Sequence, residues 1–132
     1  MKLAFTIEIP LPSYATKTKK GIRKQTTLSL NAYRNLNYHV LNKIKRDYGD
    51  LYYTLLNGQK ELSTPVLIKY TLFMNNSGRD LLNYGCMVDK IFCDSMKKKG
   101  LYYDDNVKYV TDVSFKYGGK GDDYCVIQVF DQ

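Results

Sequence analysis

The chain has 132 residues, of which 20 are Lys or Arg and 13 are Asp or Glu, so its formal net charge is +7. Hydrophobic residues make up 44% of the chain, which is enough for a packed core and excludes wholesale disorder. No apolar run approaches the roughly 20 residues that span a bilayer, so we expect no membrane segment. The three cysteines lack Cys-x-x-Cys spacing and are interpreted as reduced packing residues of a cytoplasmic protein.

The positive charge is concentrated near the N-terminus. Residues 1–50 contain ten Lys or Arg against three Asp or Glu, whereas residues 51–132 contain ten of each kind. Nine of the ten acids in the second part are Asp, a residue that favours caps, turns and ligand-holding positions over helix surfaces. This distribution favours a polyanionic partner and a site built from carboxylates.

In chain order, the first half predicts a strand, a basic connection and a long helix. The strand covers residues 3–9, and residues 13–27 form a polar, basic loop or exposed hairpin. Helical spacing of apolar residues predicts a helix over about 31–47, with a second helical segment after Gly49. The only histidine, His39, lies in this helix without a nearby nucleophile or second ligand, so it is interpreted as a packing or surface residue.

The second half predicts a strand, a helix and two further strands. The expected ranges are a strand over 65–74, a helix over 80–99 that ends at Gly100, a turn over 101–106, and strands over 107–117 and 123–130 joined by a Gly-rich hairpin. The predicted fold is therefore a single α/β (α+β-like) domain over residues 1–132. Its order is β-loop-α-β-α-β-β, and its helices pack against a small mixed sheet.

Aspartates are the residues best suited to chemistry, because the chain lacks the parts of most other catalytic motifs. Five of them fall within the second predicted helix and the turn after it: Asp80, Asp89, Asp94, Asp104 and Asp105. If they converge, they can share Mg²⁺, with Lys90 neutralising charge that develops on a phosphate. The alternative is that each aspartate only caps a helix or closes a turn. On a regular helix Asp80 and Asp89 point to opposite sides, so they share a site only if residues 80–85 are irregular.

One stretch resembles the RusA family of Holliday-junction resolvases, which are common in phages and prophages. The matching pattern is R-D-L-L-N over 79–83, V-D-K over 88–90, Asp94, and K-G-L-Y-Y-D-D-N over 99–106. Upstream, the Pro10-x-Pro12 segment and the S-L-N-A-Y-R entry to the first helix match in the same order. The resemblance therefore extends over nearly the whole chain, and residues 79–106 carry its specific part.

The resemblance implies a homodimer that binds four-way DNA junctions and makes paired, metal-dependent nicks in DNA recombination and repair. It assigns catalysis to Asp80, Lys90 and Asp105, with Asp104 as the partner of Asp105. With Asp89 added as our own substitute for a missing family residue, the expected catalytic residues are Asp80, Asp89, Lys90 and Asp105, and the expected metal ligands are Asp80, Asp89, Asp104 and Asp105. Mg²⁺ is the implied metal, with Mn²⁺ as a substitute and no small-molecule cofactor. The family's second aspartate is replaced by Leu82 here. We take Asp89 as its substitute and Asp94 as the second choice; if neither reaches the site, the protein would only bind junctions.

DNA contacts are expected from the basic connection and from the resemblance motif. The residues are Lys17, Lys19, Lys20, Arg23 and Lys24 for phosphates, together with Arg79 and Asn83 of the motif. Two alternatives remain at this point. One is a non-catalytic basic protein that binds nucleic acid. The other is a small metal-free RNA nuclease, which is disfavoured because His39 stands alone.

Overall fold

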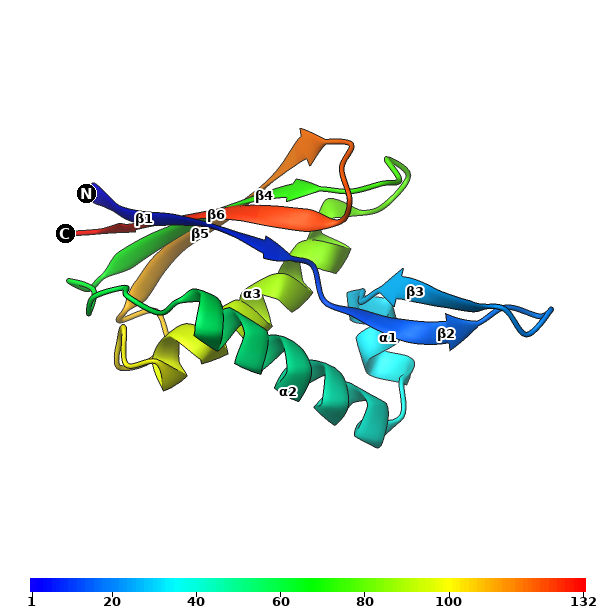
Figure 1. The fold of residues 1–132 in the computed structure, drawn as a ribbon. Coiled ribbons are helices and arrows are strands. Elements are labelled where there is room, and N and C mark those ends of the chain that lie inside the picture. The colour runs from blue at the N-terminus through cyan, green and yellow to red at the C-terminus, as the bar shows by residue number, and fades with distance from the viewer.

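The computed structural model describes residues 1–132 and places helices against a mixed sheet, which confirms the predicted α+β class (Figure 1). The elements in chain order are β1 (Lys2–Pro10), β2 (Ser13–Lys17), β3 (Arg23–Thr27), α1 (Leu30–Asn35), α2 (Tyr38–Leu55), β4 (Val66–Phe73), α3 (Leu81–Lys98), β5 (Val110–Gly119) and β6 (Tyr124–Asp131). No helix combines the length and apolar character required to cross a membrane.

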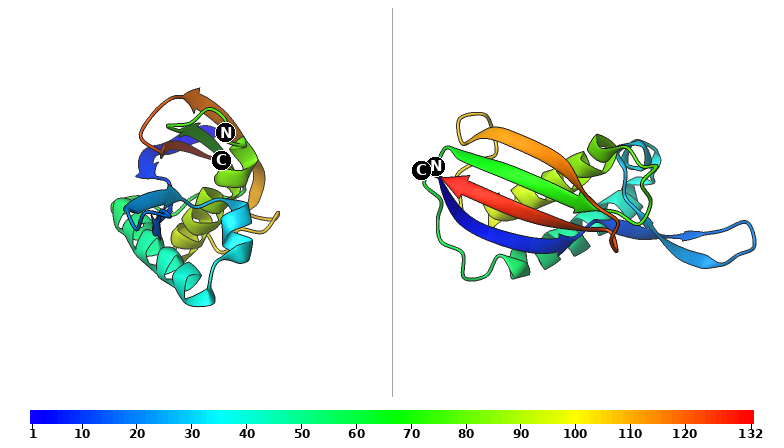
Figure 2. Two further views of the ribbon diagram at one scale, coloured as in Figure 1. Left: turned by 90° about the vertical axis from the view of Figure 1, so that its right-hand side faces the viewer. Right: turned by 90° about the horizontal axis from the view of Figure 1, so that it is seen from above.

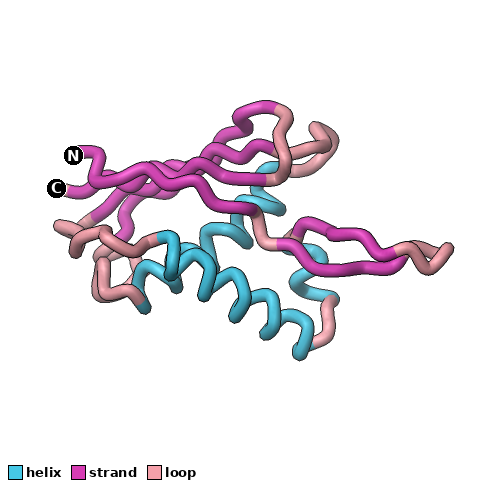
Figure 3. The backbone as a smooth tube through the Cα atoms, in the orientation of Figure 1, coloured by secondary structure: helices cyan, strands magenta, loops and turns pink.

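The main sheet has the strand order β1-β6-β4-β5. Strand β4 pairs antiparallel with β6 and parallel with β5, and the connection from β4 to β5 runs through α3. Alternate β4 side chains, Val66, Ile68, Tyr70 and Leu72, are buried on the helix side. The helices lie together on one face of the sheet (Figures 1, 2 and 3). The core therefore lies between this face and the α2–α3 pair.

The predicted hairpin between the last two strands is wrong. Strands β5 and β6 do not pair with each other, because β4 lies between them in the sheet. The local Gly-rich sequence fits a tight hairpin equally well. Strand β4 lies between these two strands instead, because its side chains at four alternate positions are apolar and buried in the core.

The predicted long helix is divided at a different place from the one expected. Helix α1 ends at Asn35, and α2 then runs without a break through Gly49 to Leu55. The break has a local cause: Leu36 is extended, and the Asn37 side chain accepts a hydrogen bond from the His39 N–H at 2.8 Å. Asparagine competes in this way with the helical backbone and starts a new helix as its N-cap. His39 itself is exposed at the start of α2.

The basic segment 13–27 forms the exposed hairpin that was one of its two predicted forms. Strands β2 and β3 pair antiparallel from Ser13 opposite Thr27 to Lys17 opposite Arg23. Gly21 turns the tip with a φ of 77°. In Figure 1 the hairpin projects away from the main sheet beyond α1. This position leaves its cations in solvent.

Helix α3 follows its predicted limits closely and is the most buried helix. Asp80 caps its N-terminus, and Gly100 follows its C-terminus with a φ of 80°. Gly85 lies against the Phe115 ring of β5, where a Cβ would come within 2.6 Å of a ring carbon. This contact fixes the N-terminal half of α3 beside the C-terminal half of β5.

Candidate functional site

The carboxylates of α3 are spread along the helix. Asp80 Oδ1 accepts the Leu82 N–H at 3.1 Å, as an N-cap does. Asp89 is half-buried, and its Oδ1 accepts the Tyr70 hydroxyl at 2.5 Å. Because residues 81–98 form one continuous helix, nine residues of rise separate Asp80 from Asp89 by about 14 Å along the axis. The irregular start that would have let these two aspartates share a site is absent.

A second group of carboxylates lies where α3 ends and the next turn begins. Asp104 Oδ1 lies 3.3 Å from Lys97 Nζ, and the same carboxylate accepts the Asp105 N–H at 2.8 Å. These contacts lower the pKa of Asp104. Partial burial, with Asp104 and Asp94 as charged neighbours, raises the pKa of Asp105. Asp105 thus lies where negative charge is concentrated, and a bound cation would relieve that repulsion.

The metal ligands expected from the sequence do not form a cluster of three. No group of three or more His, Cys, Asp or Glu side chains is arranged to hold a metal ion. Asp80 caps the N-terminus of α3, whereas Asp105 follows the helix and has Asp94 as a charged neighbour. Asp94 lies 14 residues after Asp80, which is about 21 Å of helix rise. Asp104 and Asp94 are the carboxylates whose negative charges raise the pKa of Asp105.

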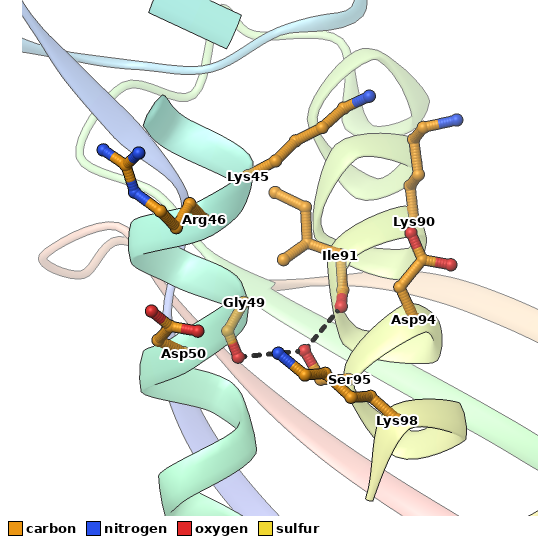
Figure 4. A pocket seen from close by; sticks show the side chains of 9 residues that line it. All are labelled: Lys45, Arg46, Gly49, Asp50, Lys90, Ile91, Asp94, Ser95 and Lys98. Carbon is orange, nitrogen blue, oxygen red and sulfur yellow. Dashed lines mark hydrogen bonds between the residues drawn. The ribbon is translucent and has the colours of Figure 1, made fainter. Parts of the chain in front are cut away.

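A groove between α2 and α3 brings Lys90 together with other cations (Figure 4). The hollow has a volume of about 190 Å³ and is lined by four cations, two carboxylates and three other residues: Lys45, Arg46, Lys90 and Lys98; Asp50 and Asp94; Gly49, Ile91 and Ser95. Its floor is fixed by Ser95, whose hydroxyl donates to the Ile91 carbonyl at 2.8 Å and to the Gly49 carbonyl at 3.3 Å. The two helices therefore hold a net positive hollow at a fixed spacing.

Two of these lysines gather at one end of the groove. Figure 4 shows the side chains of Lys45 from α2 and Lys90 from α3 reaching toward the same end. Their Nζ atoms lie 5.0 Å and 5.6 Å from the centre of the Tyr33 ring. The Lys45 ammonium beside the Tyr33 hydroxyl lowers the pKa of that phenol, and Lys90 adds to the effect. Two ammonium groups held on one aromatic ring suit a phosphate oxygen as a shared partner.

The hairpin forms a second basic surface. Its five cations are all exposed and form no ion pair: Lys17, Lys19, Lys20, Arg23 and Lys24. Unpaired lysines and arginines on a projecting arm are available for the phosphates of a polyanion. The hairpin therefore retains the features on which its expected DNA contacts depend.

The motif residues Arg79 and Asn83 have partners within the protein. Arg79 Nη1 lies 2.9 Å from Asp123 Oδ1, and the guanidinium lies 5.0 Å from the centre of the Tyr84 ring. Asn83 Oδ1 accepts the Asn31 N–H at 3.3 Å. Neither residue lines the α2–α3 groove.

Sequence reasoning missed Lys45, Arg46 and Lys98 as site residues. From the sequence, Lys45 and Arg46 contribute only to the N-terminal charge excess, and Lys98 is explained as one of three lysines at the negative end of a helix dipole. Nothing in their local spacing relates α2 to α3. The available signal for Lys98 was the four-residue spacing of Lys90, Asp94 and Lys98, which places the three side chains along one side of a helix. No protein-family model matches the chain, and no curated protein matches it.

Proposed function

We propose that this protein is a metal-dependent endonuclease that resolves four-way DNA junctions. The observation that carries the proposal is the α2–α3 groove, which holds Lys90 among three further cations and beside Asp94. The sequence resemblance assigns Lys90 to catalysis, and the groove gives it surroundings suited to a phosphodiester. Four cations against two carboxylates leave this hollow positive, as binding to a DNA backbone requires.

Within this proposal, the chain's residues divide the work between binding and charge stabilisation. The exposed cations of the hairpin bind DNA phosphates at a distance from the groove. Lys45 and Lys90 hold a phosphate at the Tyr33 end of the groove, and Lys90 stabilises the charge that develops during hydrolysis.

The proposed metal ion would be bound by carboxylates near the C-terminal end of α3. Asp105, with Asp104 and Asp94 as neighbours, offers the one or two carboxylates that Mg²⁺ uses together with waters and substrate oxygens. When bound, Mg²⁺ supplies an activated water and stabilises phosphate charge. Asp80 and Asp89 are less available as metal ligands, because Asp80 caps α3 and Asp89 accepts a hydrogen bond from the Tyr70 hydroxyl.

A second candidate function is non-catalytic binding of branched DNA. The observation that favours it is the engagement of Asp80 and Asp89 in structural hydrogen bonds. In that case the groove and the hairpin bind DNA, and the aspartates serve only the fold.

A cleavage assay on a synthetic four-way junction separates the two candidates. We expect wild type to make paired nicks with Mg²⁺ or Mn²⁺ and none with EDTA. Asp105→Asn should bind the junction with unchanged affinity but lose nicking, while the control Asp122→Asn, an exposed aspartate on the β5–β6 connection, should cut normally. Pure wild-type protein that binds the junction without metal-dependent nicking would establish the binding function instead. Cleavage that survives EDTA would point to a metal-free nuclease.

A further inference from the structure

A second hollow lies between the basic hairpin and α2. Its volume is about 580 Å³, and six of its lining residues are apolar or aromatic: Tyr14, Ala15, Val40, Ile44, Tyr48 and Leu51. Val40 and Leu51 are large apolar residues, yet each remains 38% exposed. The charged residues of the lining are Lys43 and Asp47, which pair with each other at 2.6 Å. The hollow therefore presents an uncovered apolar surface without net charge.

This hollow runs along the free edge of β2. Ser13, Tyr14 and Ala15 are consecutive and all line it, whereas one face of a strand presents only alternate residues. Strand β2 pairs only with β3, and Figure 1 shows β2 on the side of the hairpin nearer α2. The unpaired edge of β2 is therefore open toward the helix.

The backbone groups at this edge have no partner. At the two ends of the ladder, the Leu28 N–H donates to the Pro12 carbonyl at 2.7 Å, and the Thr18 N–H donates to the Ile22 carbonyl at 2.9 Å. Because bonded and non-bonded pairs alternate along an antiparallel ladder, residues 12, 14, 16 and 18 bond to β3. The residues between them, whose N–H and carbonyl groups point away from β3, are Ser13, Ala15 and Lys17. No backbone bond outside the ladder satisfies these groups.

An open strand edge beside an apolar hollow suits an extended peptide. We propose that the β2 edge binds a segment of a partner protein as an additional strand, with an apolar side chain of that segment in the hollow. A further strand supplies N–H and carbonyl groups in alternation, as the edge requires, and points alternate side chains to one side. The sugar-phosphate backbone of a nucleic acid offers phosphate acceptors but no N–H donors, so it would leave the carbonyls of the edge unpaired.

The charge of the hairpin selects an acidic segment. Residues 13–27 contain five Lys or Arg and no Asp or Glu. Lys17 ends the open edge and lies opposite Arg23 in the ladder, and neither of them forms an ion pair. A strand that continues from the hollow toward the hairpin tip thus meets only positive charge. The partner segment therefore carries an apolar residue at the hollow and Asp or Glu beside Lys17.

Fluorescence anisotropy with a synthetic peptide tests this inference on the full chain, without DNA and without nuclease activity. The probe is a short labelled peptide of alternating glutamate and valine, which wild type should bind with micromolar affinity. The same peptide with alternate backbone nitrogens methylated keeps its charge but loses donors, so it should bind about tenfold more weakly. This difference separates strand pairing from attraction between opposite charges.

A proline at the edge tests the position of the peptide. Ala15→Pro removes an outward N–H and no ladder bond, and proline is tolerated on edge strands, so the peptide should bind about fivefold more weakly. The matched control is Thr6→Pro on β1, the edge strand of the main sheet. The Thr6 N–H also points away from the neighbouring strand, because Leu11 on the same ladder bonds to Asp123 and alternates with it. This control should bind as wild type does, and circular dichroism confirms that both variants are folded.

Three results would overturn the inference. The first is a wild type that does not bind the acidic peptide, or that binds the methylated peptide equally well. The second is an Ala15→Pro variant that binds the peptide as tightly as Thr6→Pro does. The third is a labelled oligothymidine that binds wild type in place of the peptide and is lost in Ala15→Pro, which would assign the hollow to nucleic acid.

Discussion

Arg79 donates from Nη1 to Oδ1 of Asp123 at 2.9 Å, and both side chains are only 18% exposed. Asp123 also accepts hydrogen bonds from the Thr27 hydroxyl at 2.7 Å and from the Asn75 N–H at 3.0 Å. Its backbone carbonyl accepts the Leu11 N–H at 2.9 Å. A single aspartate therefore connects the end of β1, the base of the hairpin and the loop that precedes α3.

We predict that Asp123→Asn lowers the free energy of unfolding by about 1–2 kcal/mol, because charged hydrogen bonds become neutral ones. Asparagine tolerates the positive φ of 55° at this position, so the change tests charge and not backbone strain. Urea unfolding measures the loss. Asp122→Asn serves as the control and should have no effect, and equal stability of the two variants would contradict the role of Asp123.

The contribution of Asp123 to the stability of the fold should depend on pH. Burial alone would raise the pKa of Asp123, but hydrogen bonds from Thr27, Asn75 and Arg79 outweigh it, so the pKa lies below its ordinary value. A lowered folded-state pKa contributes stability above the unfolded value of about 3.9, and this contribution is lost as pH falls through the folded pKa. The stability difference between wild type and Asp123→Asn should therefore shrink below about pH 4.

Substitution of two helical glycines by alanine should change the stability of the protein in opposite directions. At Gly85 a Cβ would lie 2.6 Å from the Phe115 ring, which stacks on Tyr70 with 5.1 Å between ring centres. We expect Gly85→Ala to lower the free energy of unfolding by about 1–2 kcal/mol, because the cost of overpacking exceeds the gain in helix propensity. At Gly49 a Cβ meets nothing within 4 Å, so Gly49→Ala should stabilise by about 0.5–1 kcal/mol. Thermal unfolding of both variants checks the pair, and a stabilising Gly85→Ala would refute the close helix–strand contact.

The lysines of the groove should contribute to the salt dependence of junction binding. Each phosphate contact adds about 0.9 to the slope of log affinity against log salt concentration. Lys45→Ala and Lys90→Ala should therefore each reduce the steepness of that slope by about 1 in a fluorescence titration. Lys69→Ala is the matched control, since Lys69 lies on the outer face of the sheet over Phe130. Unchanged slopes for the groove variants would exclude the groove from the DNA path.

Cysteine reactivity should differ sharply along the chain. Cys93 and Cys125 are buried, and burial raises the pKa of the Cys125 thiol to about 12 and the pKa of Cys93 further. Cys86 is only partly covered. A colorimetric thiol reagent should therefore modify one cysteine rapidly in the native protein and all three in denaturant. Cys86→Ser should abolish the rapid phase; a rapid phase that persists would contradict the burial of the other two.

The sequence by itself determined the elements whose signals are local. A run rich in β-branched and aromatic residues predicted β4, and helical spacing with Asp80 before it and Gly100 after it predicted α3. The division at Asn37 was also encoded locally, in a side chain that caps a helix, but the apolar pattern around it was continuous and hid it. Such features depend on neighbours in the chain, so they can be identified without the fold.

Only the tertiary structure decided which elements meet. It placed β4 between β5 and β6, where a local Gly-rich signal had favoured a hairpin. It brought Lys45 and Arg46 of α2 to Lys90 of α3, and it paired Arg79 with Asp123, which lies 44 residues further along the chain. The reason is physical: burial of apolar faces selects the packing of the sheet and helices, and polar residues far apart in sequence become neighbours as a result.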